Sequence, residues 1–156
     1  MLKLLGVLLL AGGTAAAGFC AAGQLTKRAR ALQALLGALE LMERELSFRL
    51  TPMPELLERL SRQADPPADG LFAGCREGLS SLGERSLAEL WKAGVRQPAL
   101  LLEAEELALL DGLGQVLGSY DGEGQLAALA QTCAALERAL AEARSERKRM
   151  GRVYQT

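Results

Sequence analysis

The 156 residues carry 18 basic and 19 acidic side chains and no histidine, and 49% of them are hydrophobic whereas only 4% are aromatic. The charges are unevenly placed, because residues 31–143 hold nine basic and eighteen acidic groups while residues 27–30 and 144–152 are basic. An acidic body argues against a nucleic-acid binder, which presents a basic face. Three widely spaced cysteines without histidine argue against a disulfide framework and a zinc site.

The chain starts with an apolar segment, residues 4–23, that contains no charged side chain. Twenty helical residues span about 30 Å, which is the thickness of the hydrocarbon core of a bilayer. Three positive side chains, Lys27, Arg28 and Arg30, follow at once, and positive charge after an apolar span tends to stay in the cytoplasm. We therefore predict that residues 1–24 are an uncleaved transmembrane anchor and that the following domain is cytoplasmic.

The same segment also fits a cleaved signal peptide. Lys3 is a minimal basic start, residues 4–10 form a short apolar stretch, and the small residues at 15–17 or 21–23 resemble cleavage sites. On this alternative the product is an exported helical cell-envelope protein. A mature chain beginning near residue 18 or 24 would decide for it.

The apolar segment runs without a break into an amphipathic stretch, in which leucine and methionine recur at steps of three and four residues up to Leu50. We therefore predict one continuous helix for both parts. Glu43 falls inside the apolar face of this helix, between Leu39 and Leu46. Since a buried carboxylate must be paired or hydrogen-bonded, we expect Glu43 to join a structural ion pair. The alternative is that it binds a partner protein.

Four short amphipathic helices are predicted to follow. Thr51 caps the first of them, and Ser86 opens a capping box that starts the third. The second carries Leu82 on its apolar face and ends at Gly83, and Gly94 bounds the third. The fourth runs from about Glu103 to Leu117, and its acids at 103, 105 and 106 are expected to form a solvated helix terminus.

The last predicted helix is long, continues to about Met150 and ends in a basic run. Few β-branched and aromatic residues argue against sheet, so we predict an all-α fold in which residues 25–150 form an antiparallel bundle of about six helices. The first and last helices then run in opposite directions, which brings the two basic clusters to one end, beside the membrane lipid. The membrane-proximal basic residues are Lys27, Arg28, Arg30, Arg147, Lys148 and Arg149.

Residue sets that carry chemistry are missing from the sequence. Without histidine there is no Ser-His or Cys-His pair, and no GxxxxGK[ST] or GxGxxG loop occurs. We therefore expect no catalytic residue, no cofactor, no metal, no small-molecule substrate and no nucleic acid. The sequence favours a non-enzymatic protein.

Several stretches resemble the stage III sporulation protein AB family. They include the start at residues 1–6, the run 30–35, Thr51-Pro52-Met53-Pro54, and residues 117–121 with Gln125. The matching motif residues, which look like positions that shape the bundle, are Glu43, Glu45, Thr51, Pro52, Gly118, Asp121 and Gln125.

This resemblance implies a function that composition does not. The family consists of mother-cell membrane proteins of endospore-forming bacteria, and they belong to a secretion-like channel complex between mother cell and forespore. Their soluble domain is similar to the cytoplasmic domains of the type II secretion platform protein. The resemblance thus implies a platform or scaffold required for endospore formation, with a secretion-type ATPase and other sporulation channel components as partners.

The resemblance also concerns the end of the chain. Family members usually carry a second apolar segment after the basic helix, whereas residues 151–156 form only a short tail here. Either a second transmembrane segment is missing from this sequence or this member has one anchor. The basic run at 144–152 resembles the cytoplasmic flank of a second span, which favours the first alternative.

Overall fold

The computed structural model describes residues 1–80, 84–119 and 121–155, and every regular element within these ranges is a helix. The predicted all-α fold is therefore confirmed. Leu82 and Gly83, which the sequence places at the end of the third helix, lie outside the described residues. The elements are α1 (Leu2–Arg44), the π-helix η1 (Glu45–Arg49), α2 (Met53–Gln63), α3 (Asp69–Ser80), α4 (Leu87–Val95), the 3-10 helix η2 (Pro98–Leu100), α5 (Ala104–Val116) and α6 (Gly122–Gln155).

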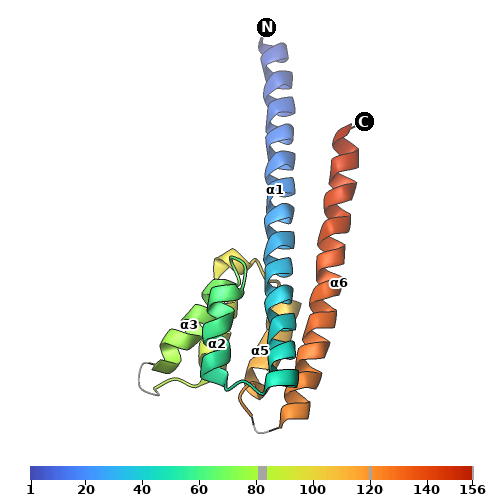
Figure 1. The fold of residues 1–156 in the computed structure, drawn as a ribbon. Coiled ribbons are helices and arrows are strands. Elements are labelled where there is room, and N and C mark those ends of the chain that lie inside the picture. The colour runs from blue at the N-terminus through green and yellow to red at the C-terminus, as the bar shows by residue number, and fades with distance from the viewer. Residues whose placement is uncertain (81–83, 120, 156) are drawn as a thin grey trace.

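The two long helices α1 and α6 lie side by side in opposite directions, and both termini lie at the same end of the molecule (Figure 1). The four shorter helices cluster against the other end of this pair. Helix α2 packs on α3, α3 on α4, α4 on α5, and α5 on α6. This is the predicted bundle in which the first and last helices are antiparallel.

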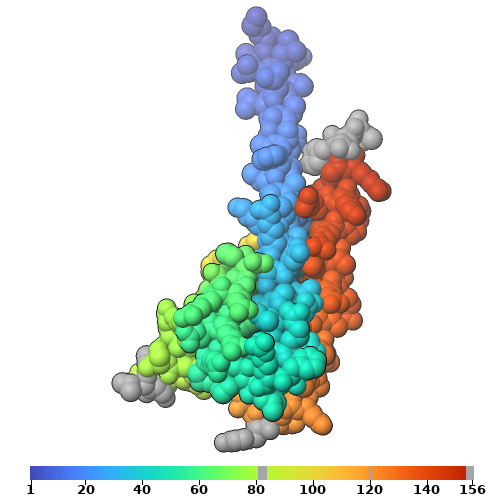
Figure 2. Space-filling view, viewed as in Figure 1, coloured from blue at the N-terminus to red at the C-terminus, as the bar shows by residue number. Residues whose placement is uncertain are grey.

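The N-terminal half of α1 stands clear of the bundle (Figure 2). Its large apolar side chains, from Leu2 to Leu10 and again at Phe19, are exposed, and burial begins only at Ala29. Among the described residues, the helical stretch Leu2–Arg49 is the one long and apolar enough to cross a membrane, with a mean hydropathy of 2.0 in its most apolar part. One helix therefore contains both an apolar exposed segment and a core segment.

The core is built on the C-terminal half of α1. Leu32, Leu35, Leu39 and Met42 are fully buried at the predicted three- and four-residue steps. Trp91 on α4 is fully buried as well, and its Nε1 donates a hydrogen bond of 2.7 Å to the carbonyl oxygen of Leu110. A buried indole N–H needs such an acceptor, so this bond fixes α4 against α5.

Glycines allow the short helices to approach closely. Gly94 was predicted to end its helix, but α4 continues through it to Val95. A Cβ atom at Gly94 would overlap the side chain of Leu71 on α3. Gly94 is therefore a packing position inside α4, because hydrogen is the only substituent for which the contact with α3 leaves room.

The prediction that Leu50 lies on the apolar face of the first helix is wrong. The last turn, Glu45–Arg49, is a π-helix, whose extra residue per turn rotates the following positions away from the core. Leu50 then adopts a left-handed backbone conformation with φ of 48° and is 82% exposed. Phe48 in the same turn is 85% exposed. Two large apolar side chains are therefore exposed at this end of the bundle.

Helix α6 is longer than predicted. It continues past Met150 to Gln155, so that residues 151–155 extend the helix. Its buried stripe of Leu129, Cys133, Leu136 and Leu140 matches the predicted seam against α1. From residue 145 to residue 153 the side chains of α6 are exposed, apart from the half-buried Met150.

Candidate functional site

The two basic clusters are brought to one level of the α1–α6 pair. Arg144 on α6 donates a hydrogen bond of 2.9 Å to Gln33 Oε1 on α1. Because the helices are antiparallel and rise equally per residue, this contact places residues 147–149 level with residues 28–30. Lys27, Arg30 and all three basic side chains of 147–149 are exposed at this end.

Arg28 differs from its two basic neighbours. Its Nη1 donates a hydrogen bond of 2.7 Å to the carbonyl oxygen of Leu101, and its Nη2 forms an ion pair with Glu106 on α5. A second carboxylate, that of Glu103, lies 3.6 Å from Nη2. The side chain is only 15% exposed. Arg28 therefore joins α1 to the start of α5, and its guanidinium faces the protein.

The expectation that the acids at 103, 105 and 106 form a solvated terminus is wrong for Glu106. This residue is only 4% exposed. One carboxylate oxygen binds Arg28, and the other accepts a hydrogen bond of 3.1 Å from the backbone N–H of Glu103. A buried carboxylate needs such partners, and the arginine that supplies one of them lies 78 residues away in the sequence.

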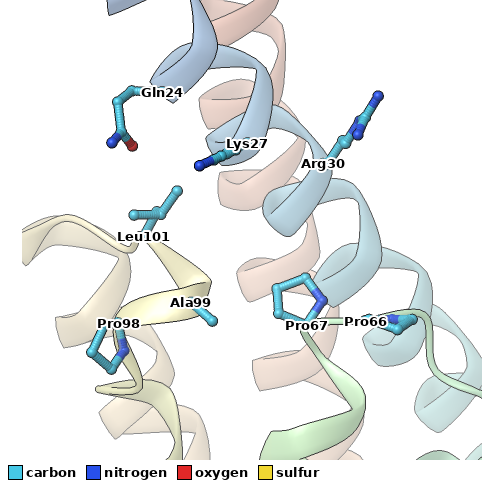
Figure 3. A pocket seen from close by; sticks show the side chains of 8 residues that line it. All are labelled: Gln24, Lys27, Arg30, Pro66, Pro67, Pro98, Ala99 and Leu101. Carbon is cyan, nitrogen blue, oxygen red and sulfur yellow. The ribbon is translucent and has the colours of Figure 1, made fainter. Parts of the chain in front are cut away.

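A groove opens on the side of α1 that carries Lys27 (Figure 3). Its volume is about 560 Å³. Lys27 extends over it toward Leu101, and Arg30 extends toward the N-terminal end of α1. Leu101 has a left-handed backbone with φ of 52°, and its carbonyl is the one that Arg28 holds. We call it the proline groove, and its lining residues are Gln24, Lys27, Arg30, Pro66, Pro67, Pro98, Ala99 and Leu101.

The motif residues Glu45 and Thr51 meet at the opposite end, which we call the distal end. Thr51 is buried and donates a hydrogen bond of 2.9 Å from Oγ1 to Glu45 Oε2, which also pairs with Arg59 at 2.9 Å. The predicted cap by Thr51 is wrong, because Pro52 occupies the N-cap position of α2. Thr51 instead links the end of α1 to the start of α2.

Gly118, Asp121 and Gln125 organise the turn between α5 and α6. Gln125 is buried, and its Nε2 donates a hydrogen bond of 2.6 Å to the carbonyl oxygen of Ser119. Gly118 has φ of 80°, a conformation that glycine adopts without strain. Asp121 Oδ1 accepts a hydrogen bond of 3.1 Å from the backbone N–H of Gly124. These three motif residues thus stabilise the same turn.

Glu43 does not form the expected ion pair with any residue that the structure describes. It is half-buried, and its charge acts on the thiol of Cys133 on α6. Burial raises the pKa of the Cys133 thiol to about 11, and the negative charges of Glu43, Glu40 and Glu137 add to the shift. The structural pairing is made two residues later, by Glu45.

A second groove at the distal end brings the two sets of motif residues together. It has a volume of about 350 Å³ and contains Thr51 from one set and Gln125 from the other. We call it the distal groove, and its lining residues are Leu46, Ser47, Leu50, Thr51, Gly122, Glu123, Gln125 and Leu126. The exposed Phe48 lies in the same turn as Ser47. The sequence pattern missed this apolar surface, because it assumed a regular α-helix up to Leu50.

Comparison with known proteins identifies the family. The profile of the family described as stage III sporulation protein AB (spore_III_AB) matches residues 3–156, nearly the whole chain. The chain belongs to this family. Stage III sporulation protein AB of Bacillus subtilis (strain 168) is 29% identical over 123 residues, which cover 78% of this chain and 71% of that protein.

A solved structure of stage III sporulation protein AB (SpoIIIAB) has the same fold. It aligns with a TM-score of 0.69 at 24% identity and covers 78% of this chain and 97% of the solved chain. Membership of the family gives the protein a role in sporulation, and the names of these relatives refer to no enzymatic activity. The long apolar N-terminal helix indicates association with a membrane.

Proposed function

We propose that the protein is a non-enzymatic platform of the sporulation channel complex, anchored in the mother-cell membrane with its bundle in the cytoplasm. The observation that carries this proposal is the continuity of α1. Its exposed apolar half and its buried half form one helix without a break. A rigid helix of this kind would hold the bundle at a set height above the bilayer.

The charges support the cytoplasmic orientation. Lys27 and Arg30 follow the apolar segment directly, and the basic residues 147–149 lie at the same level on α6. Positive side chains on both α1 and α6 favour the cytoplasmic side of the membrane. We also propose that α6, which remains helical to Gln155, leads into a second apolar span.

The partner that we propose for the distal end is the secretion-type ATPase. This end lies opposite the apolar end of α1 (Figure 1), and Phe48 and Leu50 are exposed there. Exposed apolar side chains that gather beside a groove are typical of protein–protein contact sites. The distal end is thus a surface on which a cytoplasmic partner can bind while the anchor holds the other end.

The partner proposal is tested by capture of the purified ATPase on the full-length chain in nanodiscs. Phe48→Ser with Leu50→Asn removes both apolar groups, and asparagine tolerates the positive φ at position 50. We expect capture to be lost. Leu109→Ser is the control, because Leu109 is a partly exposed leucine on α5. Undiminished capture by the double variant would refute the assignment of the distal end.

The anchor is tested on the native protein from sporulating cells. Mass spectrometry is expected to find an N-terminus at or near Met1 in the membrane fraction. A mature chain that begins near residue 18 or 24 would instead establish the exported envelope protein. Protease added to intact protoplasts should leave the bundle uncut if it is cytoplasmic, and cleavage there would overturn the orientation.

A further inference from the structure

We propose that the proline groove binds the headgroup of an anionic phospholipid, such as phosphatidylglycerol, from the membrane in which α1 is anchored. This inference rests on the proposed anchoring and adds a defined lipid site to it. The groove has the depth, the charge and the apolar wall that such a ligand requires. The first two properties come from Lys27 and Arg30, and the third comes from the residues on the opposite wall.

The level of the groove relative to the membrane follows from the helix geometry. If the apolar segment ends at residue 23 at the edge of the hydrocarbon core, Lys27 lies about 6 Å and Arg30 about 10 Å farther along the axis. The headgroup layer on each side of a bilayer is about 5–8 Å thick. Lys27 is therefore level with the lipid phosphates, and the long side chain of Arg30 extends back toward them.

The charge of the groove is uncompensated. Lys27 and Arg30 are exposed, and neither forms an ion pair with a residue that the structure describes. The lining set contains no acidic side chain. Arg28 between them is already occupied by Glu106. Lys27 extends over the groove, and Arg30 lines it with its guanidinium directed away from the prolines. An otherwise acidic domain thus has two free cations at this groove, and an anion is the ligand that they fit.

The opposite wall of the groove is apolar and rigid. It consists of Pro66 and Pro67 from the α2–α3 connection, Pro98 and Ala99 from η2, and Leu101. Proline has a fixed φ, and the carbonyl of Leu101 is held by Arg28. A preformed wall loses little freedom when a ligand binds. It suits the glycerol and upper acyl carbons of a lipid, which a free phosphate ion lacks.

The test uses the full-length chain in nanodiscs of phosphatidylcholine, with and without phosphatidylglycerol, and native mass spectrometry of the retained lipid. Lys27→Gln with Arg30→Gln removes the two cations. A lysine or arginine at an anionic surface contributes about fivefold in affinity, so the preference for phosphatidylglycerol should fall about 30-fold. Ala99→Phe fills the groove without a change of charge, and it should reduce the preference by a similar factor.

Arg147→Gln with Lys148→Gln is the matched control, since it removes two cations at the same level on α6. It should keep most of the preference. If this control loses the preference equally, or if Ala99→Phe keeps it, then the preference comes from the overall positive charge of the surface. Either result would overturn the site. Displacement of the lipid by inorganic phosphate alone would overturn it as well. Circular dichroism checks that each variant is folded.

Failure of the anchor would be recognised separately. Every variant should float with vesicles of pure phosphatidylcholine, because the apolar segment of α1 does not depend on the headgroup. If the chain does not float, the proposed membrane anchoring is wrong. If it floats but has no groove-dependent preference for phosphatidylglycerol, the anchoring stands and the lipid site is wrong.

Discussion

Arg28 on α1 and Glu106 on α5 form a nearly buried ion pair at the end of the bundle that faces the proposed membrane. The same arginine also holds the carbonyl oxygen of Leu101, which lies in the wall of the proline groove. One side chain thus connects α1, the start of α5 and the wall of the proline groove. Loss of this side chain should therefore weaken the packing at all three places.

Arg28→Met should destabilise the bundle by about 3 kcal/mol, because it leaves the buried carboxylate of Glu106 without its partner. Unfolding of the full-length chain in detergent micelles by chemical denaturant, followed through the fluorescence of Trp91, measures this loss. The chain has one tryptophan, and it is fully buried. Trp91 therefore reports directly on the core.

The neighbouring Lys27→Gln is the control and should change the free energy of unfolding by less than about 0.5 kcal/mol, since Lys27 is exposed. The double variant Arg28→Met with Glu106→Gln should lose less than the sum of the two single variants. Glutamine at position 106 keeps an acceptor for the N–H of Glu103, and it leaves no unpaired charge in the buried site. Strict additivity would mean that the pair is not coupled.

Gly114→Ala should destabilise the bundle by about 2 kcal/mol through overpacking. A Cβ atom at Gly114 would lie 2.5 Å from Cδ1 of Trp91. The indole has no room to retreat, because it donates to Leu110 and packs edge-on against Phe72 at 5.9 Å between ring centroids. Thermal unfolding monitored by circular dichroism would show the loss.

Gly112→Ala on the same helix is the matched control. Nothing lies within 4 Å of a Cβ at this position, and alanine forms helix better than glycine by up to about 1 kcal/mol. We therefore expect a small gain in stability. A loss of equal size in both variants would show that the α4–α5 contact differs from the one described.

The parts of the fold that sequence could predict are those set by local periodicity. The buried stripe from Leu32 to Met42 and the seam of α6 follow from contacts one helical turn apart. The antiparallel arrangement of α1 and α6 followed from an even number of predicted helices with short connections. These properties do not depend on knowing which distant residues meet.

The partners of charged residues could not be predicted in this way. Arg28 and Glu106 are 78 positions apart, and no pattern distinguishes Arg28 from the exposed Lys27 and Arg30 beside it. The π-helical turn was missed because each of its residues tolerates a normal α-turn. Glu43 was expected to be paired, but it is Glu45 that binds Thr51 and Arg59.

Gln125→Ala should cost about 1.5 kcal/mol, because it leaves the carbonyl oxygen of Ser119 without its donor in the turn between α5 and α6. Denaturant unfolding compares this variant with Gln131→Ala, which changes an exposed glutamine on the same helix. The control should change stability by less than about 0.5 kcal/mol. Equal small effects would mean that the turn does not depend on Gln125.

The buried thiols should make the bundle less stable in alkali. Burial raises the pKa of Cys75 to about 12 and, with help from Glu43, that of Cys133 to about 11, from an ordinary value of 9.0. The unfolded chain then loses its thiol protons before the folded chain does. The stabilising effect is therefore complete below about pH 9 and is lost progressively as the pH rises toward the folded pKa values.

Each of these two thiols should lower the free energy of unfolding by about 1 kcal/mol between about pH 9 and pH 10. The pH dependence of denaturant unfolding measures this slope. Cys75→Ala and Cys133→Ala should each remove the contribution of one thiol to it. Cys20→Ala is the control, because Cys20 lies in the exposed apolar part of α1 and should not change the slope. Glu43→Gln should lower the pKa of Cys133 and so reduce its share, since it removes the largest of the charges that oppose the thiolate. An unchanged slope in Cys75→Ala would contradict the burial of this thiol in the folded bundle.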